Sequence, residues 1–194
     1  MMKRTASLLI FAALLFSLCA CASKPAAPSE GSRDGYVEVL NSACELTKHF
    51  DRALMDKVVP PGETDYFIDF YREKKNEDYI EALGSDYARI AAEYDEYFGD
   101  DWKLTCTVLD AEERDEAGIQ QYRDFDSYFF STYGYDPAKV DAVTIVKVKL
   151  HIEGSKASND KEKTLQFFRT GGEWYSFYAA RLGINLIPKG EGSN

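Results

Sequence analysis

The histidines are the first candidates for acid–base or metal chemistry, and the sequence contains two, His49 and His151. No HExxH, CxxC or glycine-rich phosphate-binding loop accompanies them, so the common metal, redox and nucleotide sites have no basis in the sequence. His49 follows Lys48 and is expected at a solvated helix edge. His151 alternates with Lys149 and Glu153 on the polar side of an expected strand. We therefore predict no catalytic residue.

Acidic side chains are the next candidates, because some are spaced as cation ligands can be. Asp65 and Asp69 stand one helical turn apart, and four more acids surround the end of an expected helix: Asp95, Glu96, Asp100 and Asp101. Calcium takes several such oxygen ligands, but the ligand order of an EF-hand loop is absent. Surface acids are commonplace in a chain this acidic. We therefore expect them to serve solubility, and we predict no metal and no cofactor.

Two cysteines, Cys44 and Cys106, lie in the body of the chain. Outside the cytoplasm such a pair can form a disulfide, provided that a helix carrying Cys44 covers the strand carrying Cys106. Both positions also fall on apolar faces, where a free thiol behaves as a small hydrophobic side chain. A disulfide and a pair of buried free thiols both stay open, and free thiols are the expectation.

The N-terminal residues indicate where the chain is sent. Lys3 and Arg4 precede an apolar stretch over residues 6–18, which is the order of a secretory signal. A membrane-spanning helix needs about 20 apolar residues, so this stretch is too short to be one. The sequence therefore predicts a signal peptide rather than an anchor helix.

The end of that stretch, Leu18-Cys19-Ala20-Cys21, resembles the lipobox of bacterial lipoproteins and implies that Cys21 carries the lipid. Cys19 fits the pattern less well, because bulky Leu18 stands directly before it. Ordinary cleavage beside Ala20 or Ala22, which would release a secreted protein, is the alternative. Two acyl chains on Cys21 would anchor the protein stably at the extracytoplasmic face of a bacterial membrane.

These features divide the chain into four parts. A signal peptide is expected over 1–20, the lipidated cysteine and a flexible tether rich in Ala, Pro, Ser and Gly over 21–35, one globular domain over 36–187, and a disordered tail over 188–194. With 23 basic and 33 acidic residues, the net charge of −10 opposes binding to a phosphate backbone. Nucleic acid is therefore not an expected partner.

Hydrophobic periodicity predicts helices before strands. Apolar residues at steps of three or four indicate helices over 36–58, from Thr64 or Asp65 to about 72, and over 80–97. Alternation then indicates a strand over 102–108. Helical spacing returns over about 116–133, and alternation indicates a strand over 140–153 whose core face runs from Val140 through Ala142 to Ile152. After a polar turn over 154–160, two strands at 161–170 and 173–180 are joined by Gly171-Gly172. The predicted fold is α+β, with helices packed on one face of a curved, mainly antiparallel four-stranded sheet.

Aromatic residues are unusually frequent, with 13 Tyr, 12 Phe and 2 Trp. Most fall at positions that the periodicity already assigns to the core, and the rest are free to line a ligand pocket or an interface. If the strand parities align, an apolar patch forms on the outer sheet face and offers a surface for a homodimer. Its residues are Val143, Ile145, Phe168, Tyr175 and Phe177.

The closing segment from Leu165 to Tyr175, an apolar strand, a Gly-Gly turn and a second strand with Trp174, resembles the nuclear transport factor 2-like (cystatin-like) superfamily. The likeness covers about residues 36–180, and outside the closing segment it rests on element order. It implies a cone-shaped sheet wrapped around a long N-terminal helix, with a pocket that some members use for catalysis. The fold hosts both enzymes and binding proteins, so it does not fix the activity.

The leading hypothesis is a non-enzymatic, membrane-anchored lipoprotein domain that binds a small apolar or aromatic ligand, or a protein partner. The excess of aromatic residues without catalytic groups motivates it. The alternative is an isomerase- or hydrolase-like enzyme that uses His151 or Asp69 in a pocket with a Tyr hydroxyl. A third hypothesis gives the outer sheet face the main role, as a homodimer interface.

Overall fold

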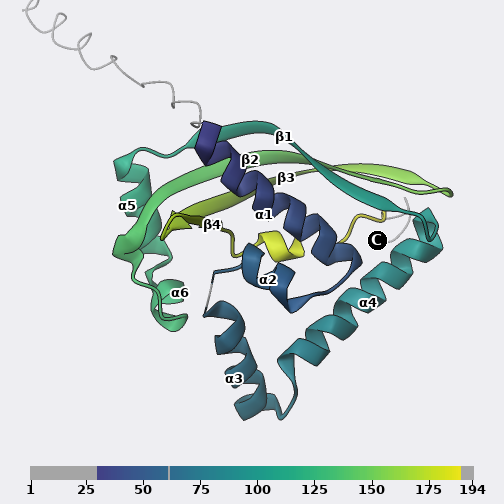
Figure 1. Cartoon of the computed structure of the whole chain (residues 1–194), viewed down its shortest axis with the longest axis horizontal. Helices are drawn as coiled ribbons and strands as arrows, with labels where there is room; N and C mark the ends of the chain where they lie inside the picture. Colours follow the sequence, from purple (N-terminus) through teal and green to yellow (C-terminus); the bar gives the residue numbers. More distant parts are fainter. Residues whose placement is uncertain (1–29, 61, 189–194) are drawn as a thin grey trace, which may run out of the picture.

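The computed structural model describes residues 30–60 and 62–188, and it has an α+β fold in which N-terminal helices pack against a four-stranded antiparallel sheet (Figure 1). This confirms the predicted fold class. The helices that come first are α1 (Glu30–Lys48), α2 (Arg52–Val58), α3 (Glu63–Lys75) and α4 (Tyr79–Phe98). The strands, in sheet order, are β1 (Lys103–Glu113), β2 (Val140–Glu153), β3 (Ser158–Thr170) and β4 (Glu173–Tyr175). Between β1 and β2 the chain forms α5 (Glu116–Phe125), α6 (Ser127–Thr132) and the 3₁₀ turn η1 (Pro137–Lys139), and after β4 it forms the 3₁₀ turn η2 (Ala179–Arg181).

The helix predicted over 36–58 is two helices, and it begins earlier than expected. The first starts at Glu30, inside the segment assigned to the tether, and ends at Lys48. Asp51 then starts the second, because its carboxylate accepts a hydrogen bond from the Ala53 amide at 2.6 Å. The apolar stripe is continuous through the break, which is why periodicity alone does not reveal it.

The strand predictions are correct for β2 and need adjusting at the ends of the others. The acidic residues after position 108 extend β1 to Glu113, because they pair with the first half of β2. The turn predicted over 154–160 is shorter, since Ser158 already pairs with Glu153. Gly171 and Gly172 make the expected tight turn, with φ angles of 63° and 89°. The last strand ends at Tyr175 rather than near 180, where η2 takes over.

The sheet has a core on each face. One core lies between the sheet and helices α1, α2 and α4, and its largest fully buried side chains include Tyr36, Tyr94, Phe98 and Trp102. The other, which we call the outer core, lies where α5 and α6 cover the opposite face. It contains Ile119, Tyr122, Phe130, Val140, Val143 and Phe168. Val140 was expected on the face of Ala142, but the register shifts between these two residues and moves Val140 into the outer core.

The predicted dimer face is therefore not an exposed surface. The strand parities align as expected, but Val143 and Phe168 are both 0% exposed beneath α5 and α6, and Tyr175 and Phe177 pack against them. The cause is the helix predicted over about 116–133, which is two short helices that fold back over this face. Ile145 is only partly covered. A homodimer stays a prediction, and it would need other surface residues.

The lipid-anchor predictions fall on residues outside this description. Cys21, the signal peptide over 1–20, the tether as far as residue 29 and the tail over 189–194 lie beyond the described part of the chain. Within residues 30–60 and 62–188, no helix combines the length and the apolar character that crossing a bilayer requires.

Candidate functional site

A cavity of about 610 Å³ lies among α3, α4 and the segment around η2. In Figure 1 α3 and α4 form a V whose open side faces η2. Aromatic rings line much of this space, which we call the aromatic cavity, and they include Phe67, Tyr71, Tyr79, Tyr87 and Tyr133. Its volume falls in the range of about 300–1,000 Å³ that is typical of small-molecule sites.

The rings of the cavity wall are held by helix spacing and by stacking. Phe67 and Tyr71 stand four residues apart on α3, so both project from the same side of the helix. Tyr79 opens α4 and contacts both, with ring centroids 5.3 Å from Phe67 and 4.9 Å from Tyr71. Asp78 fixes this helix start by accepting a hydrogen bond from the Glu81 amide at 3.0 Å. The wall is therefore an ordered aromatic surface.

Glu63 is a buried carboxylic acid in this aromatic lining. It is 9% exposed, and its Oε2 atom has no hydrogen-bond partner among the described residues. Burial raises the pKa of Glu63 to about 8, although the positive charge of Arg181 opposes this rise. Burial also raises the pKa of Tyr79, to about 12, with the charge of Glu63 as a second cause. The carboxyl of Glu63 is thus neutral over much of the ordinary pH range.

The backbone before Glu63 determines its position. Gly62 has a φ of 86°, and a Cβ atom at this residue would lie 2.2 Å from the backbone oxygen of Tyr133. The helix then starts at Glu63, with Gly62 as its N-cap and no side-chain cap. Sequence reasoning expected Thr64 or Asp65 at this cap and did not single out Glu63. The available signal was an acid directly after a Pro-Pro-Gly turn.

The η2 side of the cavity is fixed by tyrosines of α4. The hydroxyl of Tyr87 donates a hydrogen bond to the backbone oxygen of Ala180. The hydroxyl of Tyr94 donates to the oxygen of Gly183 at 2.5 Å and accepts from the amide of Leu186 at 2.9 Å. These bonds hold the segment that carries Arg181 against α4.

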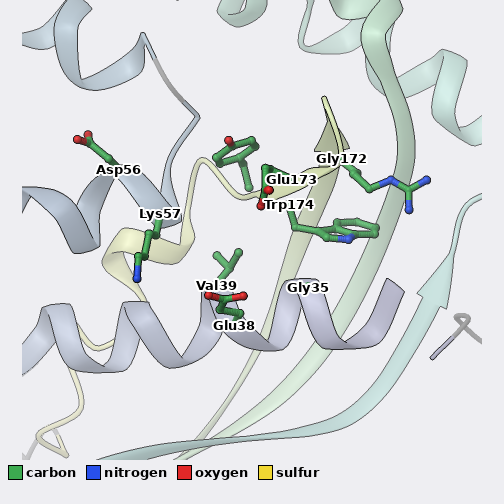
Figure 2. A pocket seen from close by; sticks show the side chains of 10 residues that line it. Gly35, Glu38, Val39, Asp56, Lys57, Gly172, Glu173 and Trp174 are labelled. Atoms are coloured by element: carbon green, nitrogen blue, oxygen red, sulfur yellow. The ribbon is translucent and has the colours of Figure 1, made fainter. Parts of the chain in front are cut away.

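A second, smaller cavity of about 260 Å³ lies between α1, α2 and the β3–β4 hairpin (Figure 2). Trp174 forms its buried wall, and the charged side chains Glu38, Lys57 and Glu173 around it are exposed. Figure 2 shows Lys57 extending from α2 toward α1 while Asp56 points the other way. Because water solvates these exposed charges, this cavity has less reason to hold a ligand than the aromatic cavity.

The catalytic alternatives from the sequence do not meet in a cavity. His151 is 41% exposed, and its ring nitrogens contact Asp160 at 2.7 Å and Glu153 at 3.3 Å. These two acids raise the pKa of His151. Asp69 is exposed and pairs with Arg72 at 2.9 Å. Neither His151 nor Asp69 lines the aromatic cavity, and the enzyme alternative stays a prediction.

The candidate cation ligands have other partners. Asp65 pairs with Arg52 at 3.1 Å, and Asp95 accepts a hydrogen bond from the indole nitrogen of Trp102 at 2.7 Å. Asp101 accepts from the Ser155 amide at 2.8 Å. In the described part of the chain, no three His, Cys, Asp or Glu residues are placed to hold a metal ion together.

Cys44 and Cys106 lie next to each other where α1 packs on β1. The helix α1 packs on β1, as the predicted geometry required, and the two thiols are free and in hydrogen-bond contact. This contact raises the pKa of Cys44 and lowers that of Cys106, because the Cys44 thiol donates to the other sulfur. A covalent disulfide between them stays a prediction.

Comparisons with known proteins give no further guide to this site. The chain matches no protein-family model, no curated protein and no solved structure.

Proposed function

We propose that this chain is a non-enzymatic binding domain, held at the extracytoplasmic face of a bacterial membrane by a lipid on Cys21, and that the aromatic cavity takes a small molecule with an aromatic or apolar body. The observation that carries the proposal is the cavity of about 610 Å³ with its wall of closely packed aromatic rings. Such rings offer a large contact area to a flat apolar group.

The residues on the cavity wall support binding rather than a role in core packing alone. Phe67, Tyr71 and Tyr79 stay partly exposed, whereas the aromatic residues of the outer core such as Phe130 and Phe168 are fully buried. A ligand seated on the α3–α4 wall would cover the exposed part of these rings and gain the free energy of removing apolar surface from water.

The nuclear transport factor 2-like relationship remains part of the proposal. The order of helices before a four-stranded antiparallel meander supports it. The proposed binding site lies among α3, α4 and η2, and the concave space under the sheet is filled by the main core.

Binding of an uncharged aromatic probe to the full chain tests the cavity. We expect 2-phenylethanol at millimolar concentration to shift the amide NMR signals of cavity residues. Leu83→Trp, which places a large ring in the cavity, should abolish these shifts, and Leu109→Trp on exposed β1 is the matched control. Shifts spread over the whole surface, or the same shifts in the folded Leu83→Trp variant, would contradict the proposal.

The lipid anchor has its own test. Cys21→Ser should move the protein from the membrane fraction to the extracytoplasmic soluble fraction of the producing bacterium, because the thiol that carries the lipid is lost. Cys19→Ser is the matched control and should leave the protein on the membrane. Loss of the membrane fraction in Cys19→Ser but not in Cys21→Ser would overturn this part of the proposal.

A further inference from the structure

The aromatic cavity holds a buried carboxylic acid, Glu63, with an oxygen atom that no other described residue contacts through a hydrogen bond. Oε2 of Glu63 has no hydrogen-bond partner among the described residues although the side chain is 9% exposed. A buried polar atom without a partner costs free energy, and more so when it is charged. A ligand that donates hydrogen bonds or brings a positive charge would remove that cost.

Arg181, an exposed residue of η2, supplies an opposite charge in the lining of the same cavity. Its guanidinium forms no ion pair within 4.0 Å with any carboxylate of the described residues, Glu63 included. Its positive charge nevertheless lies near enough to lower the pKa of Glu63 against the effect of burial. The two groups therefore share one cavity without a direct contact.

The other charged residues of the cavity lining already have partners. Lys163 donates a hydrogen bond to the backbone oxygen of Leu182 at 2.5 Å. Arg89 pairs with Glu93 at 2.7 Å and lies 3.7 Å from Asp86. Among the described residues that line the cavity, Glu63 and Arg181 are thus the charged side chains that remain for a ligand.

We propose that the ligand is a zwitterion of the amino-acid type with a large apolar side chain, whose ammonium group contacts Glu63 and whose carboxylate contacts Arg181. Its side chain would lie on the wall formed by Phe67, Tyr71 and Tyr79. A ligand with both charges pairs each group without leaving the other unmatched, whereas an amine or a carboxylate pairs only one. The identity of the ligand class rests on the proposed function of the same cavity.

Four probes with the same phenyl ring separate the contributions. L-Phenylalanine carries both charges, 2-phenylethylamine lacks the carboxylate, 3-phenylpropionate lacks the ammonium group, and 2-phenylethanol carries neither. Isothermal titration of the full chain near pH 8 should give L-phenylalanine the lowest Kd, about tenfold below that of either singly charged probe, as expected for one charge-assisted hydrogen bond.

Charge-removing variants assign each contact. Glu63→Gln should weaken L-phenylalanine and 2-phenylethylamine about tenfold and leave 3-phenylpropionate unchanged, and Arg181→Gln should do the converse. Glu73→Gln and Arg72→Gln are the matched controls, because both residues are exposed on α3 away from the cavity. The controls should bind all four probes as the unchanged chain does.

The outcomes that overturn this inference differ from those that overturn the proposed function. Equal Kd values for all four probes, or binding of L-phenylalanine that Glu63→Gln does not weaken, would remove the zwitterion and leave an aromatic binding site. If 2-phenylethylamine binds as tightly as L-phenylalanine, the ligand class is an organic cation and the role of Arg181 is wrong. If none of the probes binds, 2-phenylethanol included, the proposed function fails as well.

Discussion

Two aromatic regions of this chain each enclose a buried acid, and they treat that acid differently. In the outer core, Asp126 accepts a hydrogen bond from Tyr122, which lowers the pKa of the aspartate against the effect of burial. In the aromatic cavity, Oε2 of Glu63 has no such partner among the described residues. The acid of the outer core therefore has a hydrogen-bond donor within the chain, whereas we propose that a bound molecule supplies one for Glu63.

The two regions also differ in the burial of their aromatic rings, which is complete in the outer core and partial in the aromatic cavity. Phe130 and Phe168 meet edge to face, with ring centroids 5.3 Å apart, and both are 0% exposed. Phe67 and Tyr79 have similarly close rings, but both stay partly exposed beside an open volume. Aromatic content is therefore shared by both regions, and the proposed site is distinguished by partly exposed rings beside a buried acid without a hydrogen-bond partner at Oε2.

Replacing one phenylalanine by alanine in each region should give the largest difference in stability between the two regions. Phe168→Ala should lower the free energy of unfolding by about 3–5 kcal/mol, because it leaves a cavity in a closed core. Phe67→Ala should cost about 1 kcal/mol, since much of that ring already faces open space, and it should weaken binding of 2-phenylethanol. Chemical denaturation of both variants checks this. Equal losses of stability would show that the two regions are packed alike.

Glu63→Gln should change how stability depends on pH. The folded pKa of Glu63, about 8, lies above its ordinary value of 4.5. The stability linked to its protonation is fully present below pH 4.5 and is lost as pH rises toward 8. The loss should be on the order of 5 kcal/mol in the unchanged chain and absent in the variant.

Denaturation curves at several pH values between 4 and 9 measure this effect, with Glu73→Gln as the exposed control. The control should lose stability with pH in the same way as the unchanged chain. If Glu63→Gln and the unchanged chain show parallel curves, Glu63 is solvated and the cavity acid is not buried.

Removing one tyrosine hydroxyl from each region should give a smaller difference in stability between the two regions. Tyr122→Phe should cost about 1–2 kcal/mol, because it leaves Asp126 buried without its hydrogen-bond donor. Tyr79→Phe should be close to neutral, since no hydrogen bond of the Tyr79 hydroxyl is found among the described residues. Thermal unfolding of the two variants gives the difference. A larger loss in Tyr79→Phe would mean that the cavity hydroxyl is a structural contact.

The smallest effect is expected at a surface group that belongs to neither region. Asp160 and Glu153 raise the pKa of exposed His151, so the stability it contributes is present below pH 6.5 and is lost as pH rises through its folded pKa. His151→Gln should flatten this dependence by an amount near the error of a denaturation curve, because water screens exposed pairs. A clear effect would mean that surface charges obscure the Glu63 measurement.

The sequence predicts the sheet well because strand pattern and turn chemistry agree there. The alternation over 140–153 gives β2 with its observed bounds, and the Gly171-Gly172 turn fixes the hairpin. The break at Asp51 and the two-helix form of the 116–133 segment were missed, since an apolar stripe continues through a capped break without changing its period. The folding of α5 and α6 over Val143 was also missed, because a strand pattern does not show which element covers its face.

The candidate site was harder to predict than the fold. The excess of aromatic residues pointed to a pocket, but the residues that define it come from three separate segments, with Glu63 on α3, Tyr79 on α4 and Arg181 on η2. No local motif links them, since only the tertiary packing of α3 and α4 against the C-terminal segment brings them together. His151, the histidine considered for catalysis, remains on the exposed face that its alternation indicated.

Titration of the Glu63 carboxyl by carbon NMR, with and without L-phenylalanine, tests the central claim most directly. We expect a pKa of about 8 for Glu63 in the free protein, because the acid is buried without a partner at Oε2, and a clearly lower pKa when the ammonium group of L-phenylalanine is bound. A pKa near 4.5 in the free protein that L-phenylalanine does not change would contradict it.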